Sequence, residues 1–217
     1  MNDIFNFLRQ LSKNNNRDWF EVHRKQYENA LKYFVEIADK LIAGISSFDK
    51  GISGLNSRQC IFRIYRDTRF SKDKTPYKTN FGAFFNKSGK KVHEAGYYCH
   101  LEPGNSFLAG GIYMPDNNVL KLLRQEIYYN FDEFEKIIKA SDFVEFFKRI
   151  EGDSLLLPPK NFPKEFKGMG YLKLKDYTVV HAYHPEKMNM EQFLNYCIKI
   201  FKAMKPFNDF LNQALIT

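Results

Sequence analysis

The hydrophobic period of this chain changes once, near Gly51 and Gly54, and that change limits its fold more than any other feature. Upstream, apolar side chains recur at steps of three and four over about seven helical turns, which predicts a long amphipathic helix. The positions on this stripe are Phe20, His23, Tyr27, Leu31, Phe34, Ala38, Leu41 and Ile45. Downstream the period falls to two, which is typical of strands. Helices and strands in separate blocks predict an α+β fold.

Alternation predicts four strands, at residues 58–66, 80–86, 94–102 and 106–113. The turns after the second and third of them are short, which favours an antiparallel meander of at least four strands. Residues 171–183 predict one or two further strands, and residues 189–215 predict a closing helix bent or broken at Pro206. We expect the long N-terminal helix and the C-terminal helices to flank the sheet.

Length and composition predict one domain over residues 1–217, without a linker or an internal repeat. No stretch approaches the ~18 apolar residues of a membrane helix, and the N-terminus does not resemble a secretory signal. The three cysteines, Cys60, Cys99 and Cys197, are odd in number and far apart. We therefore expect reduced, buried thiols and a cytoplasmic protein without a membrane partner.

Positive charge is concentrated in residues 58–91. The chain has a net charge of +8, and this segment accounts for all of it. Its basic residues are Arg58, Arg63, Arg66, Arg69, Lys72, Lys74, Lys78, Lys87, Lys90 and Lys91. Only Asp67 and Asp73 oppose them. Such a local excess predicts an anionic partner for one region of the surface.

The segment 62–78 is the strongest candidate for a binding site. Strand alternation would bury an arginine whichever face of residues 62–66 points inward, and a buried guanidinium needs a carboxylate or a bound anion. A phosphate- or carboxylate-bearing small molecule would be clamped by arginines, with lysines adding charge and one tyrosine orienting it. The predicted anion-binding residues are Arg63, Arg66, Arg69, Lys72, Lys74, Tyr77 and Lys78.

Two alternatives concern the same segment. Asp67 and Asp73 could simply brace the long loop at residues 67–79 by pairing with its basic residues. If the segment instead supports catalysis, one of these two carboxylates is the candidate general base. The sequence leaves open whether the protein is an enzyme.

Three motifs resemble an uncharacterised family, widespread in bacteria and present in some fungi, that is catalogued only as a domain of unknown function. They are NNNRDWF at residues 14–20 with Tyr27 downstream, RDTRFSKDKTPYK at 66–78, and FLAGGIY at 107–113. The resemblance covers nearly the whole chain. It supports a single domain and the choice of the central segment, and it carries over no activity, cofactor or catalytic residue.

A nucleic-acid-binding module is the alternative function. It would use the same charges together with Lys87, Lys90 and Lys91 at a hairpin tip, and the aromatic residues that interleave with them. These aromatic residues are Tyr65, Phe70, Tyr77, Phe84 and Phe85. A protein-interaction domain that docks acidic partners is a further alternative.

The sequence gives no cofactor signature and no metal site. His181 and His184 would lie on opposite faces of a strand, without further ligands at zinc spacing. His100 and Glu102 share one strand face and could form an acid/base pair, with His93 and Glu94 nearby. Solvated strand positions are the expectation for these four residues.

Overall fold

The computed structural model describes residues 1–90 and 94–216, and it has an α+β fold built on one antiparallel sheet. The strands are β1 (Phe81–Phe85), β2 (Gly96–Leu101), β3 (Phe107–Ile112) and β4 (Tyr177–Ala182), and they pair in the order β1-β2-β3-β4. The pairing of β1 with β2 and of β2 with β3 confirms the predicted meander through residue 112.

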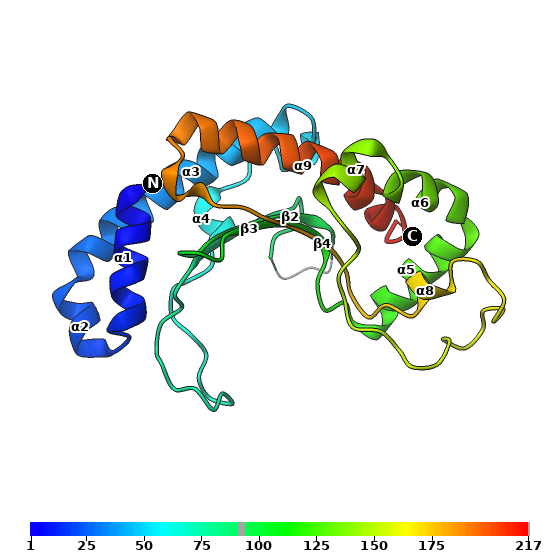
Figure 1. The fold of residues 1–217 in the computed structure, drawn as a ribbon, viewed down its shortest axis with the longest axis horizontal. Helices are drawn as coiled ribbons and strands as arrows, with labels where there is room; N and C mark the ends of the chain where they lie inside the picture. The colour runs from blue at the N-terminus through cyan, green and yellow to red at the C-terminus, as the bar shows by residue number, and fades with distance from the viewer. Residues whose placement is uncertain (91–93, 217) are drawn as a thin grey trace.

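Two long helices cover one face of this sheet (Figure 1). They are α3 (Arg24–Ser46) and α9 (Met190–Gln213), and α9 continues through Pro206 without a break. The other helical elements are α1 (Asn2–Lys13), α2 (Arg17–Val22), η1 (Lys50–Ile52), α4 (Ser57–Cys60), α5 (Asn117–Tyr129), α6 (Phe131–Ile138), α7 (Ser141–Phe146), α8 (Met169–Leu172) and η2 (Pro185–Lys187). The long N-terminal helix predicted from Phe20 onward is interrupted at His23, where α2 ends and α3 begins.

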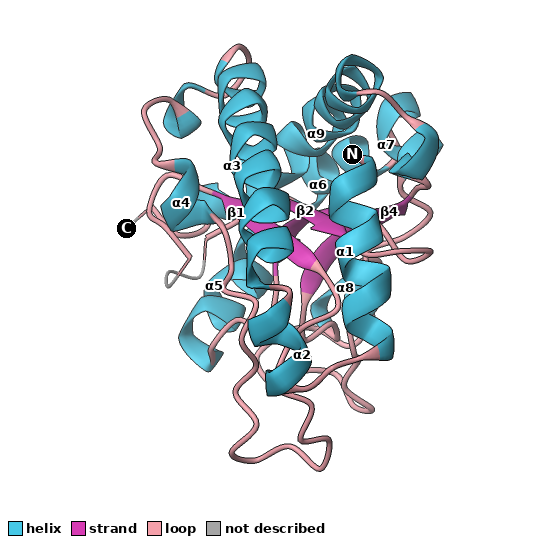
Figure 2. Cartoon of the chain, turned by 90° about the vertical axis from the view of Figure 1, so that its left-hand side faces the viewer, coloured by secondary structure: helices cyan, strands magenta, loops and turns pink. Residues whose placement is uncertain are grey.

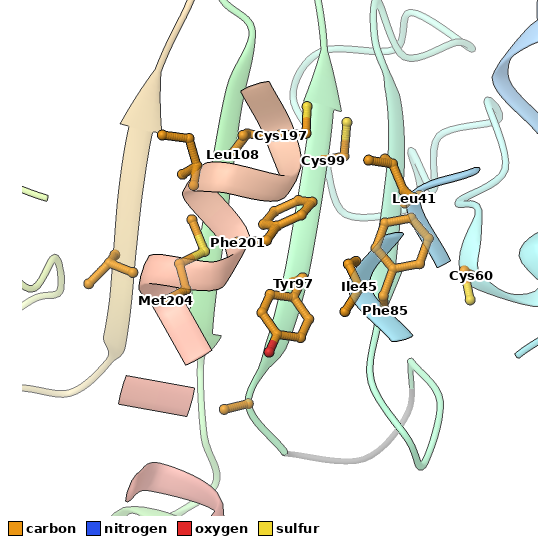
Figure 3. Close-up of a cluster of buried hydrophobic side chains, with 14 of the residues drawn as sticks. Leu41, Ile45, Cys60, Phe85, Tyr97, Cys99, Leu108, Cys197, Phe201 and Met204 are labelled. Carbon is orange, nitrogen blue, oxygen red and sulfur yellow. The ribbon is translucent and has the colours of Figure 1, made fainter. Parts of the chain in front are cut away.

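The core lies between the sheet and these two helices (Figure 3). Alternate side chains of the strands point into it, among them Phe85 of β1 and Tyr97 of β2. Leu41 of α3 and Phe201 of α9 pack against them, and all four side chains are less than 2% exposed. Burial of large rings here explains most of the high aromatic content.

The predicted first strand, 58–66, is wrong. Residues 57–60 form α4, because Asn56 caps its first turn by accepting a hydrogen bond from the Arg58 amide at 3.0 Å. Residues 61–66 run antiparallel to residues 76–83 but make only isolated bridges, Ile61 with Ala83 and Tyr65 with Tyr77. Between these bridges three residues (62–64) lie opposite five (78–82), so the ladder is interrupted by a bulge.

The fourth place in the sheet belongs to β4, which returns from far along the chain to pair with β3. Gly111 of β3 allows the first residues of β4 to lie close to the β3 backbone. Its φ is +96°, and a Cβ on it would lie 2.0 Å from the carbonyl oxygen of Tyr177. A side chain there would therefore collide with the backbone of the neighbouring strand.

The expectation that residues 62–66 bury an arginine is also wrong. Among residues 61–66 the buried side chains are Ile61 and Ile64, three residues apart, rather than every second residue. Arg63 is exposed, and the side chain of Arg66 is 26% exposed. The bulge turns the segment so that both guanidinium groups reach solvent.

Two general expectations can be compared with the described residues. Cys60, Cys99 and Cys197 are free and buried, as predicted for small apolar side chains. Among residues 1–90 and 94–216, no helix combines the length and apolar character that crossing a membrane requires.

Candidate functional site

Residues 62–78 form an irregular hairpin, here called the basic hairpin, that extends from the sheet beside α2 (Figure 2). Two backbone hydrogen bonds hold its arms together. The Arg66 amide donates to the Pro76 carbonyl at 2.9 Å, and the Lys78 amide donates to the Ile64 carbonyl at 2.8 Å. The loop predicted between two strands is therefore the outer part of this hairpin.

The motif at residues 14–20 holds the base of the basic hairpin. The Asn15 amide group donates to the Tyr77 carbonyl at 2.9 Å and accepts from the Tyr77 amide at 3.1 Å. The ring of Phe20 stacks on the ring of Tyr77, with centroids 4.0 Å apart and planes 12° apart. Tyr77, predicted to orient an anion, is 4% exposed and forms part of this contact.

Within the hairpin, the acidic side chains pair with arginines. Asp67 accepts from the Arg69 guanidinium at 3.0 and 2.7 Å. Asp73 accepts from the Arg66 guanidinium and, at 2.9 Å, from the Thr75 amide. These contacts match the bracing role considered for the loop.

Both carboxylates are held firmly in the charged form. The Arg69 guanidinium lowers the pKa of Asp67 to about 2, and the Thr75 amide, followed by the Arg66 guanidinium, lowers the pKa of Asp73 to about 2. A carboxylate with so low a pKa is a weak general base at neutral pH. The geometry therefore does not favour Asp67 or Asp73 in that role.

A shallow pocket of about 420 Å³ lies between the basic hairpin and the start of α2. We call it the hairpin pocket. Its lining residues are Asn15, Asn16, Arg17, Thr68, Lys74, Thr75 and Pro76. They supply a guanidinium, an ammonium, two hydroxyl groups and two amides, and they include no carboxylate.

Contacts already made in the pocket fix parts of its lining. The Lys74 ammonium donates to the Thr68 carbonyl at 2.9 Å, which fixes its position at the rim. The Arg66 guanidinium donates to the Thr75 hydroxyl, so Arg66 holds a lining residue in place without lining the pocket itself. Charge-assisted donors and hydroxyls in this arrangement suit a phosphate or carboxylate group.

A second group of positive charges lies at the base of the hairpin. The Nζ atoms of Lys78 and Lys90 lie 5.5 and 5.0 Å from the ring centroid of Phe62. Burial lowers the pKa of both lysines, and the nearby charge of Arg63 lowers the pKa of Lys78 further. Neither lysine forms an ion pair within the part of the chain that the structure describes.

The remaining charges of the segment are dispersed. Lys72 is exposed on the outer part of the hairpin and Lys87 is exposed in the β1–β2 connection. Lys90 folds back and donates to the Ile61 carbonyl at 2.6 Å, so it is not the solvated tip residue that we expected. Lys91 and His93 lie outside the described residues.

Sequence reasoning missed three lining residues of the hairpin pocket. Asn15, Asn16 and Arg17 belong to a motif that was used for the family resemblance but not for a site. Asn16 caps α2 by accepting from the Trp19 amide at 2.9 Å. Asparagine is a preferred residue at a helix N-cap, and this is the local signal that could have found it. The long-range pairing of Asn15 with Tyr77 left no local signal.

The histidine candidates differ in their surroundings. His181 is held between the Phe146 carbonyl and the Tyr196 hydroxyl, at 3.0 and 2.6 Å. His184 is exposed. His100 is only 9% exposed, so the expectation of a solvated strand position is wrong for it. In residues 1–90 and 94–216, no three His, Cys, Asp or Glu side chains are grouped so that they could hold a metal ion.

Comparisons with known proteins agree with the resemblance seen in the motifs. Neither the curated proteins nor the solved structures include a match to this chain. The family described as "Conserved hypothetical protein (DUF2461)" matches residues 3–210. This match spans every strand of the sheet and both motifs that meet at the hairpin pocket. The chain therefore belongs to the DUF2461 family.

Proposed function

We propose that this protein binds a small molecule that carries a phosphate or carboxylate group, and that the hairpin pocket receives the anionic group. The observation that carries the proposal is the lining of the pocket. Arg17 and Lys74 provide positive charge, Thr68 provides a hydroxyl, and none of the described lining residues is acidic. A bound anion would relieve the repulsion among the basic residues of the hairpin.

The predicted binding residues divide into three groups under this proposal. Lys74 lines the pocket, whereas Arg66 and Tyr77 shape it through Thr75 and Asn15. Arg63 and Lys78 belong to the cationic group around Phe62. Arg69 and Lys72 lie outward on the hairpin, where they would attract an anion at longer range.

The test is a thermal-unfolding titration with inorganic phosphate, compared with chloride at equal ionic strength. A ligand that binds only the folded protein stabilises it by about 2.7 kcal/mol at a hundred times its dissociation constant. We expect phosphate to raise the melting temperature beyond chloride in the parent protein. The double variant Arg17→Met with Lys74→Met should lose this increment, because both pocket charges are gone while the side-chain stems remain.

Lys72→Met is the matched control, since it removes a charge from the same hairpin without touching the pocket. It should keep most of the phosphate increment, because salt screens the longer-range attraction of Lys72. Equal responses of the parent protein and the double variant would refute the proposal. Arg66 is unsuitable for this experiment, because its removal would break its bonds to Asp73 and Thr75 and alter the hairpin itself.

One observation favours nucleic acid as a second candidate. Phe70 is 95% exposed on the outer part of the hairpin, and the Arg69 guanidinium lies 5.9 Å from its ring centroid. An exposed ring among cations is what single-strand binders use for stacking. Of the other aromatic residues considered, Tyr77 and Phe85 are buried. A second titration with a single-stranded oligonucleotide in place of phosphate separates the two candidates. If the protein binds nucleic acid, the oligonucleotide affinity should fall steeply with salt and depend on Phe70.

A cytoplasmic location stays a prediction, supported by the three free and buried thiols.

A further inference from the structure

The face of the sheet opposite α3 and α9 carries a row of polar side chains. Among the described elements, no helix lies against this face (Figure 1). Alternation along β2 directs Tyr98 and His100 toward it, and Glu102 follows at the end of the strand. Tyr98 is half-buried, so its ring still reaches the surface of the sheet.

These three side chains form a continuous hydrogen-bond chain. The Tyr98 hydroxyl lies 3.0 Å from Nδ1 of His100. Nε2 of His100 lies 3.3 Å from a carboxylate oxygen of Glu102. A hydroxyl, an imidazole and a carboxylate in this order have the arrangement of a nucleophile, its general base and the group that orients the base.

The hydrogen bonds fix the tautomer of the imidazole. Burial raises the pKa of Glu102, but hydrogen bonds from Thr79, Asn105 and His100 outweigh it and keep the pKa below its ordinary value. Glu102 is therefore ionised at neutral pH and can only accept, so the proton of the neutral ring lies on Nε2. The lone pair of Nδ1 then points at the Tyr98 hydroxyl, with the Asn80 amide nitrogen 3.3 Å away.

At neutral pH the resting protonation states leave the proton on Tyr98 and a lone pair on His100. Burial lowers the pKa of His100 despite the neighbouring Glu102, so Nδ1 is free to accept a proton at neutral pH. Burial raises the pKa of Tyr98, so its hydroxyl stays protonated until a reaction withdraws the proton. The charged or titratable groups that face His100 from the described elements are Glu102 and Tyr98.

Neighbouring groups hold each member of the chain in place. The Thr79 hydroxyl and the Asn105 amide donate to Glu102 at 2.6 and 3.0 Å. Phe107 of β3 stacks on the His100 ring, with centroids 4.3 Å apart. Gly82 of β1 leaves room for Tyr98, since a Cβ there would lie 2.5 Å from the Tyr98 hydroxyl oxygen.

We propose that Tyr98, His100 and Glu102 form a catalytic site for acyl transfer, with Tyr98 as nucleophile, His100 as general base and Glu102 as the residue that positions His100. The substrate class is a carboxylic ester that reaches the open face of the sheet. This inference does not depend on anion binding, because none of the three residues lines the hairpin pocket.

The reaction proceeds in two balanced steps. The Tyr98 oxygen attacks the ester carbonyl carbon while its proton moves to Nδ1 of His100, and Glu102 stabilises the resulting imidazolium. The bond between the carbonyl carbon and the leaving oxygen breaks, and His100 returns the proton to that oxygen. Water then attacks the acyl-tyrosine with His100 again as base, which releases the carboxylic acid and restores Tyr98.

The experiment uses 4-nitrophenyl acetate as the probe, with peptide mass spectrometry to locate acetylated tyrosines and absorbance to follow 4-nitrophenolate. Tyr113 and Tyr129 are internal references, because they are 71% and 75% exposed. We expect Tyr98 to react faster than both references although it is less exposed. His100→Gln, which can still bridge its two neighbours by hydrogen bonds, should slow the Tyr98 reaction about 100-fold.

The controls separate catalysis from structure. Tyr98→Phe should abolish the fast phase of nitrophenolate release, and His184→Gln, a change at an exposed histidine, should leave it unaltered. If His100→Gln does not fold, Glu102→Gln serves as the second variant and should slow the reaction as well.

Ring ¹⁵N shifts of the parent protein provide a test without substitution, since a proton on Nδ1 in the neutral ring overturns the proposal. A Tyr98 rate no higher than that of Tyr113 and Tyr129 also overturns it.

Discussion

Asp73 shows how single side chains neutralise the most basic segment of the chain. It accepts from the Thr75 amide at 2.9 Å and from the Thr75 hydroxyl at 3.0 Å, and it also accepts from Arg66. The first two contacts are local, as in turns where an aspartate bonds the backbone two residues ahead. The third contact crosses the hairpin and ties its two arms together.

The protonation of Asp73 should therefore respond to Arg66. The folded pKa of about 2 lies below the ordinary value of 3.8, so the stabilisation from Asp73 is present above pH 3.8 and is lost as the pH falls through about 2. In Arg66→Ala we expect the midpoint to rise only part of the way to 3.8, because the Thr75 amide is the larger cause. Carboxyl ¹³C shifts measured against pH check this. Asp67, paired with Arg69, is the control whose midpoint should not move; a parent midpoint of 3.8 for Asp73 would contradict the account.

At the scale of elements, local patterns predicted β1, β2 and β3, because their apolar side chains alternate and short turns join them. They also predicted the apolar stripe of α3, because its side chains recur every three or four residues. The segment 58–66 was predicted wrongly, since Asn56 starts a helix turn there and the following bulge breaks the alternation. The place of β4 beside β3 depends on contacts between residues about 70 positions apart, which no local pattern contains.

The candidate sites divide in the same way. The charge of the basic hairpin was evident from the sequence, because charge needs only residue types. The hairpin pocket was not, because Asn15 and Arg17 reach it through folding. Strand alternation placed His100 and Glu102 on one face, but solvated positions were the expectation for both. The burial of His100 and its contact with Tyr98 were not expected, since Gly82 on another strand creates the space for Tyr98.

Asn208 of α9 joins helix and sheet, and its loss should be costly. Its amide group donates to the Gly96 carbonyl at 3.0 Å and accepts from the Gly111 amide at 2.8 Å, and the residue is 2% exposed. Asn208→Ala would leave a buried donor and a buried acceptor unpaired, at about 1–3 kcal/mol each. Denaturant unfolding should show a loss of about 3 kcal/mol. Asn118→Ala, at an exposed position of α5, should change stability by less than about 0.5 kcal/mol. A loss that small at Asn208 would disprove this role.

On the scale of the whole molecule, the protein is an arch (Figure 1). The sheet with α3 and α9 forms its middle, α1, α2 and the basic hairpin form one end, and α5 to α8 form the other. The middle holds the most extensively buried core, whereas residues 66–76 of the hairpin bury no side chain. The base of the hairpin is held by the buried Ile64 and by the contacts of Asn15 and Phe20 with Tyr77. Elements with few buried contacts open first in native-state fluctuations.

This arrangement predicts that the hairpin can open while the sheet stays folded. In native-state amide exchange, the Tyr77 amide should become less protected in Asn15→Ala, because Asn15 is its acceptor at 3.1 Å. The Tyr97 amide in the middle of the arch should keep the exchange rate of the parent protein, apart from any change in global stability. Asn14→Ala is the matched control, since the amide group of the neighbouring Asn14 donates to the Gln10 carbonyl of α1 at 3.0 Å and not to the hairpin. Equal loss of protection at Tyr77 and Tyr97 would show that the hairpin and the sheet unfold together, and the hairpin pocket would then be as rigid as the core.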